Sequence, residues 1–123
     1  MIKGHEIITC ELSEGEINLA YRLIPSFKNR TKDNPVKSFE IVAGVNKVYN
    51  TKKKFTDVRL RKIINFYRVN SILPVISTSS GYYVSYEKKD IDDMILSLSQ
   101  RAGSIFDCAI GLKRILNNSK NGK

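Results

Sequence analysis

The stretch KKKFTDVRLRKIINFYRVNS, residues 52–71, decides the fold that the sequence predicts. Seven lysine and arginine residues against the single acid Asp57 give it a net charge of +6, out of +9 for the whole chain. Four apolar residues recur at the spacing of one helical face: Leu60, Ile63, Ile64 and Tyr67. Four other residues are expected to project away from this face: Arg59, Lys62, Asn65 and Phe66. The stretch therefore predicts a helix with a core-facing side and a cationic side, as a helix in the major groove of DNA requires.

The start of this helix and the segment before it predict a helix-turn-helix. Thr56 stands where an N-cap belongs, and Asp57 follows in the first turn, where a negative charge suits the helix dipole. A second helix is expected before it over residues 38–49, capped by Ser38. Residues 50–54 then form the connector, which is longer than in the tightest helix-turn-helix motifs.

A β-hairpin is expected directly after the cationic helix. Two short segments rich in β-branched and aromatic residues, 73–78 and 82–86, flank the turn sequence Ser79-Ser80-Gly81. Because adjacent strand residues face opposite ways, one of Tyr82 and Tyr83 is expected in the core. A hairpin in this place is a wing. The expected fold class is therefore α+β, mainly α: a winged helix-turn-helix of three helices and a β-hairpin, with a long C-terminal helix.

A first helix is expected over residues 14–29. Ser13 followed three residues later by Glu16 is a capping-box signature. Pro25 interrupts the apolar pattern, so this helix either ends early or bends and continues. The polar loop after it ends at Val36, which is a candidate for a single-residue β-bridge.

The most regular apolar pattern of the chain covers residues 90–117. Its steps alternate between four and three, which is an unbroken heptad series: Ile91, Ile95, Leu98, Ala102, Ile105, Ala109, Leu112 and Leu116. This stripe is longer than one small domain can bury, so a homodimer through the C-terminal helix is expected. The alternative is a long helix that packs wholly on its own domain.

Length and composition suit one soluble globular domain. The chain has 123 residues, of which 41% are hydrophobic and 27% charged. The expected parts are an N-terminal arm (1–12), the winged helix-turn-helix (13–88), the dimerisation helix (89–117) and a disordered tail (118–123). No apolar run has the length of a membrane span, and the first residues are too polar for a signal peptide, so a cytoplasmic protein with no membrane contact is expected. A net charge of +9 favours an anionic partner.

Residues with catalytic or metal-binding potential are few. Cys10 and Cys108 are far apart and are expected to be reduced and mostly buried. His5 is the only histidine, and with Cys10 it falls short of the four ligands of structural zinc. Three acids at the start of the last helix are better explained by dipole compensation than by a metal: Asp90, Asp92 and Asp93. We expect no catalytic residue, no metal and no cofactor.

The residues expected to contact double-stranded DNA fall into three groups. Lys52, Lys53 and Lys54 precede the cationic helix and should meet phosphates. Thr56, Arg59, Arg61, Lys62 and Asn65 lie at the start and in the first two turns of that helix. There arginine favours guanine and asparagine favours adenine, and the rotation of the helix decides which side chains face the groove. Ser79 and Ser80 at the hairpin tip can donate hydrogen bonds to phosphate.

This arrangement resembles the small winged-helix proteins that bacteriophages and prophages commonly encode. The resemblance covers about residues 14–116 and is carried by LRKII (60–64), LPVIS (73–77) and SGYY (80–83), followed by the long helix that begins DIDDMILSLSQRA. It implies a phage-related DNA-binding protein in the cytoplasm of a bacterial host cell. Roles in that family vary between transcription regulation and DNA replication, and the resemblance implies no catalytic residue.

A second class of function stays open on the sequence. Winged helices also dock on proteins, and a small phage protein of this kind can bind and inhibit a host or phage protein. The basic residues would then face an acidic protein surface. The cationic helix favours DNA, whereas the hairpin tip, which has no lysine or arginine, slightly favours a protein partner.

Overall fold

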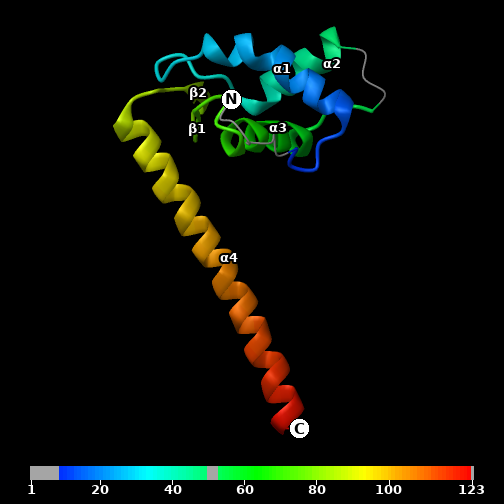
Figure 1. The fold of residues 1–123 in the computed structure, drawn as a ribbon, viewed down its shortest axis with the longest axis vertical. Helices are drawn as coiled ribbons and strands as arrows, with labels where there is room; N and C mark the ends of the chain where they lie inside the picture. The colour runs from blue at the N-terminus through cyan, green and yellow to red at the C-terminus, as the bar shows by residue number, and fades with distance from the viewer. Residues whose placement is uncertain (1–8, 50–52, 123) are drawn as a thin grey trace, which may run out of the picture. The chain divides into compact units, whose positions relative to one another are not determined.

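The computed structural model describes residues 9–49 and 53–122 of the chain, with side chains to Ser119. The chain forms two compact units, one up to Glu87 and one from Lys88 onward. The first unit contains α1 (Glu14–Lys28), α2 (Ser38–Val48), α3 (Asp57–Val69), β1 (Val75–Thr78) and β2 (Gly81–Val84) (Figure 1). The second unit is the single helix α4 (Lys88–Gly122). The fold is therefore α+β and mainly helical, as predicted.

Helix α1 begins with the predicted capping box. The backbone N–H of Ser13 donates to Glu16 Oε1 over 3.0 Å, and the N–H of Glu16 donates to Ser13 Oγ over 3.2 Å. The helix continues through Pro25 to Lys28. Beyond the proline, Phe27 is 2% exposed and meets Tyr67 edge-on, with ring centroids 5.6 Å apart. The burial of this ring offsets the backbone hydrogen bond that the proline removes.

Helix α2 begins at Ser38, but its N-cap is Lys37, so the predicted cap was wrong by one residue. The reason is that Glu40 reaches back to accept a hydrogen bond from the backbone N–H of Lys37, over 3.0 Å. Just before it, Val36 forms the predicted single β-bridge. Its N–H donates to the carbonyl of Tyr82 over 2.8 Å, and its carbonyl accepts from Tyr82 over 2.7 Å.

The hairpin of β1 and β2 is antiparallel, with Val75 opposite Val84 and Thr78 opposite Gly81. Of the two adjacent tyrosines, Tyr82 is half-buried and packs against the core cluster around α3, as expected for one of them. Tyr83 is buried at 4% exposure but lies outside that cluster.

Helix α3 is the centre of the core. Its predicted apolar face is buried, and its N-cap is Thr56, whose hydroxyl accepts from the backbone N–H of Arg59. Phe66 was predicted to project elsewhere, but it is fully buried against Tyr21, with ring centroids 5.9 Å apart. The cause is that α1 and α2 both pack on α3, so that more than one side of this helix is covered (Figure 1). Tyr67 donates its hydroxyl hydrogen to the carbonyl of Ala20 inside this core.

The described part of the N-terminal arm is a turn. Cys10 and Glu11 have φ angles of 55° and 65°, and the N–H of Leu12 donates to the carbonyl of Thr9 over 3.0 Å. The turn brings Leu12 into the core at 7% exposure. His5 lies outside the described residues.

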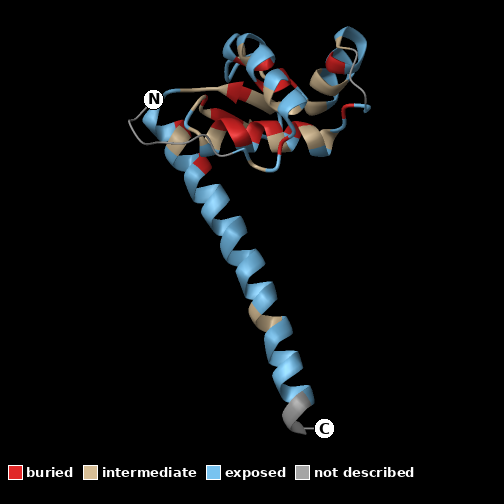
Figure 2. Cartoon of the chain, turned by 45° about the vertical axis from the view of Figure 1, so that its right-hand side comes forward, coloured by how far each residue is buried: buried red, intermediate tan, exposed pale blue. Residues whose placement is uncertain are grey.

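Helix α4 is longer than predicted at both ends. It begins at Lys88, where Lys88 pairs with Asp92 and Lys89 with Asp93, and it extends to Gly122 instead of ending before a disordered tail over residues 118–123. Asparagine, serine and lysine lower helix propensity only slightly, so a helix that has already formed propagates through them. Its surface is exposed over most of its length (Figure 2). None of the helices in the described residues is both long and apolar enough to cross a membrane.

The two cysteines differ in their surroundings. Cys10 is half-buried, and burial followed by the nearby charge of Glu11 raises the pKa of its thiol. Cys108 is exposed on α4, so the prediction that both are mostly buried was wrong for Cys108. Cys10 and Cys108 are not joined by a disulfide bond.

Candidate nucleic-acid interface

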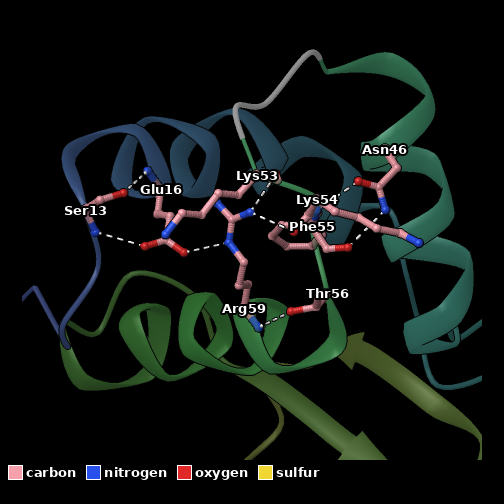
Figure 3. A network of polar contacts seen from close by, with 8 residues as sticks. All are labelled: Ser13, Glu16, Asn46, Lys53, Lys54, Phe55, Thr56 and Arg59. Carbon is pink, nitrogen blue, oxygen red and sulfur yellow. Dashed lines mark hydrogen bonds and ion pairs between the residues drawn. The ribbon is translucent and has the colours of Figure 1, made fainter.

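Arg59 holds the end of the connector that precedes α3, at Lys53 and Lys54. Its Nη1 donates to the carbonyls of Lys53 and Lys54 over 2.9 and 3.0 Å, and its Nε donates to Glu16 Oε2 over 2.9 Å (Figure 3). The guanidinium carbon also lies 5.5 Å from the centroid of the Phe55 ring. Arg59 therefore links α1, the connector and α3 in one network.

This network corrects the role predicted for Arg59. The Arg59 and Glu16 side chains are only 21% and 13% exposed, so the ion pair is largely screened from water. To reach a base edge, Arg59 would have to leave Glu16 behind as a half-buried charge without its partner, which is strongly unfavourable. In the structure Arg59 therefore holds the backbone of Lys53 and Lys54 in place, and its side chain is turned toward Glu16 instead of outward.

The acid of this pair has a perturbed pKa. Burial alone would raise the pKa of Glu16, but the backbone hydrogen bond from Ser13, the hydrogen bond from Arg59 and the charge of Arg59 outweigh it. The pKa of Glu16 is therefore lower than usual, and its carboxylate stays ionised in mildly acidic solution.

A second anchor holds the connector from the side of α2. Asn46 Nδ2 donates to the carbonyl of Phe55 over 3.0 Å, and Asn46 Oδ1 accepts from the N–H of Phe55 over 2.9 Å (Figure 3). The ring of Phe55 is fully buried. Lys53 and Lys54 are thus exposed residues on a backbone segment, 53–55, that Arg59 and Asn46 hold by hydrogen bonds. The predicted contact Lys52 lies outside the described residues.

The outward stripe of α3 consists of the exposed residues that face away from the core. Val58, Arg61 and Asn65 follow each other at intervals of three and four residues, and all three are exposed. Arg61 pairs with Asp57 over 2.9 Å, and these side chains are 66% and 47% exposed. An exposed pair within one helix is worth less than about 1 kcal/mol, so Arg61 can exchange it for another acceptor. Lys62 lies on the flank toward α1, half-buried beside a hollow that Arg22 and Lys53 also line.

Arg68 connects the end of α3 to the hairpin by hydrogen bonds. Its Nε donates to the carbonyl of Val75 over 3.0 Å, and its Nη2 donates to Ser77 Oγ over 3.3 Å. The hairpin tip with Ser79 and Ser80 is exposed. Burial first, and then the negative charge of Asp57 on α3, raise the pKa of Tyr82 on β2, so that this phenol stays neutral beside α3.

The structure sorts the predicted residues into two groups. The first group has exposed or half-buried side chains outside the Arg59 network: Lys53, Lys54, Thr56, Arg61, Lys62, Asn65, Ser79 and Ser80. The second group is Arg59 alone, which is also half-buried but donates its hydrogen bonds to Glu16 and to the carbonyls of Lys53 and Lys54. The positioning residues that sequence reasoning missed are Asn46 and Arg68. An asparagine inside a helix, where its propensity is low, was the only signal for Asn46, and the position of Arg68 next to the hairpin was the signal for its contact.

No family model matches this chain, and neither the curated proteins nor the solved structures contain a match to it. The exposed residues of α3, together with Lys53, Lys54 and the hairpin tip, are therefore the basis for a functional proposal.

Proposed function

We propose that this chain is a DNA-binding protein of the winged helix-turn-helix class, with α3 in the major groove and the β1–β2 hairpin as the wing. The observation that carries the proposal is the outward stripe of α3. Arg61 and Asn65 are exposed there one helical turn apart, and the opposite side of the same helix is the centre of the core. An arginine and an asparagine at this spacing are suited to read neighbouring guanine and adenine edges.

Phosphate contacts would come from the segments before and after α3. Lys53 and Lys54 are exposed on the anchored connector, and the hairpin tip presents Ser79 and Ser80. The Thr56 hydroxyl accepts the capping hydrogen bond and keeps its own hydrogen for a phosphate oxygen. Such contacts provide affinity and position, whereas Arg61 and Asn65 provide sequence preference. The biological role would be regulation of transcription or participation in DNA replication, in a phage-related setting.

The test is binding to random duplex DNA, followed by fluorescence anisotropy over a salt series. The double variant Lys53→Ala/Lys54→Ala should lower the slope of log K against log salt by up to about 1.8, since each phosphate contact contributes about 0.9. Arg114→Ala on α4 is a charge control, because it removes one exposed positive charge that is not among the proposed DNA contacts. A folded sample that does not bind at low salt would overturn the proposal.

Sequence preference is tested separately, on a duplex selected from a random pool. Arg61→Ala and Asn65→Ala should each weaken binding to the selected duplex by about tenfold to a hundredfold, and bring it closer to binding of random DNA. If Arg61→Ala behaves like Arg114→Ala on the selected duplex, α3 does not read bases through Arg61.

A protein-docking function is the second candidate, and two exposed apolar side chains favour it. Phe39 at the start of α2 is 66% exposed and Val58 on α3 is 58% exposed. The Phe39 side chain has neither a positive charge nor a hydrogen-bond donor, so it cannot bind phosphate. Under this alternative the chain fails to bind DNA at low salt, and Phe39→Ser weakens binding to an acidic host or phage protein.

We also propose that the chain forms a homodimer through α4. Along the heptad series, Ile95, Ile105 and Leu112 are 55%, 70% and 67% exposed. Exposed apolar side chains in a continuous row mark an interaction surface. The molar mass from sedimentation equilibrium tests this, and Ile105→Asp should convert the dimer into a monomer.

A further inference from the structure

The sizes of the seam residues distinguish a parallel from an antiparallel arrangement of the two helices in the proposed α4 dimer. We define the seam as the heptad series Ile91, Ile95, Leu98, Ala102, Ile105, Ala109, Leu112 and Leu116. In a parallel dimer each seam residue meets the same residue of the second copy. Ala102 and Ala109 would then form two layers of alanine against alanine, and both layers would be underfilled.

An antiparallel dimer centred between Gly103 and Ser104 removes both underfilled layers. Residues at equal distances from this midpoint then share a layer. Ala102 meets Ile105 of the second copy, and Ala109 meets Leu98 of the second copy. Each alanine therefore faces a large side chain, and the outer layers pair Ile95 with Leu112. Alternation of large and small residues across a seam is how helix interfaces reach native packing density.

The charges beside the seam favour the same direction. Asp92 and Lys113 occupy the same flanking heptad position, directly after a seam residue. An antiparallel pair places this flank beside its own copy, so that Asp92 lies close to Lys113 of the second copy. In a parallel pair this flank faces Met94, Arg101, Cys108 and Ile115 of the second copy. Parallel heptad register places Arg101 beside Phe106 and Cys108 beside Lys113, so that Lys113 meets no acid and Asp92 meets none of these residues. Antiparallel helices also align their dipoles favourably.

Phe106 adds a third observation. It is 66% exposed and lies on the same flank as Asp92, less than one turn from the midpoint. In the antiparallel pair both copies of this ring cover the same side of the central layers. In a parallel pair they would lie on opposite sides of the dimer and stay largely exposed.

We infer that α4 pairs with α4 of a second copy in antiparallel orientation, centred between Gly103 and Ser104. This inference rests on the proposed dimer and is independent of DNA binding. The two copies of a residue near the end of the seam are then far apart. At 1.5 Å per residue, the two copies of Asp93 are separated by about 32 Å along the axis, and those of Ser104 by about 1.5 Å.

The experiment measures distances between spin labels in the full chain. Both native cysteines are replaced, as Cys10→Ala and Cys108→Ala, and one label is introduced through Asp93→Cys or Ser104→Cys. Both sites point away from the seam, and Ser104 is the control because its two copies lie close together in either direction. We expect the Asp93 distance to exceed the Ser104 distance by about 15 Å or more. Equal short distances at both sites would overturn the antiparallel direction.

Charge exchange gives a second readout that needs no label. Asp92→Lys alone should raise the dimer dissociation constant by about threefold to tenfold, and adding Lys113→Asp should restore it. A dimer in which the second substitution brings no recovery contradicts the pairing of these two residues. A parent chain that sediments as a monomer overturns the dimer itself, and a dimer with equal label distances overturns only its direction.

Discussion

Replacing Gly81 by alanine would place a methyl group where the hairpin meets the segment before α2. The added Cβ would lie 2.6 Å from the carbonyl oxygen of Val36 and 2.9 Å from its carbonyl carbon. Both are backbone atoms, which a side-chain rotation cannot move aside. The φ angle of Gly81 is 132°, which residues with a Cβ rarely adopt.

The size of the effect follows from these two terms. The backbone conformation alone costs a residue with a Cβ about 1–3 kcal/mol. Moving Val36 away would also weaken its two hydrogen bonds with Tyr82, each worth about 1 kcal/mol. We expect the free energy of unfolding to fall by roughly 2–4 kcal/mol, which for a unit of this size lowers the melting temperature by roughly 10–25 °C.

The assay is thermal unfolding followed by tyrosine near-ultraviolet circular dichroism. All six tyrosines precede Lys88, so the signal reports on the first unit alone. Gly44→Ala is the matched control, since Gly44 is exposed within α2 and a Cβ there meets nothing within 4 Å. It should raise stability by about 0.5–1 kcal/mol. A Gly81→Ala melting temperature within about 2 °C of the parent, or a shift in the same direction for both variants, would refute the reasoning.

Three further predictions follow from single polar groups. Asn46→Ala removes both hydrogen bonds to Phe55 and should lower the free energy of unfolding by roughly 1–3 kcal/mol, measured by urea titration, whereas Asn46→Asp keeps the acceptor and should lose less. Tyr67→Phe removes the buried hydrogen bond from its hydroxyl to the carbonyl of Ala20 and should cost about 1 kcal/mol in the same titration, and an unchanged midpoint would contradict it. Because the folded-state pKa of Glu16 is lower than its unfolded value, its stabilisation is present above the unfolded pKa and is lost as the pH falls through the folded one. The midpoint of Glu16→Gln should therefore fall less than that of the parent between about pH 5 and pH 3.

The elements that sequence reasoning predicted well are those set by local chemistry. The capping box of Ser13 and Glu16, the N-cap Thr56 and the turn before Gly81 depend on residues within a few positions of one another. The bridge at Val36 was also predicted, although its partner strand was not. Local hydrogen bonds and apolar spacing need no knowledge of the tertiary arrangement, so a single sequence carries them.

The errors arose where a second element decides the environment of a side chain. Phe66 lies outside the main apolar face of α3 and is buried because α1 covers that side. Arg59 was assigned to the groove by its charge, but Glu16, 43 positions away in the chain, turns it inward. Charge and periodicity indicate that α3 is amphipathic. Which of its cations turns inward depends on where a neighbouring helix supplies an acid.

The hydrogen bonds that hold residues 53–55 have a thermodynamic consequence for an anionic ligand. Because Arg59 and Asn46 already order the backbone around Lys53 and Lys54, binding has to immobilise only the lysine side chains, and little chain entropy is lost. Arg59→Lys would loosen the connector without removing any exposed charge. Calorimetry of such a variant would then show weaker binding through a less favourable entropy, at nearly unchanged salt dependence.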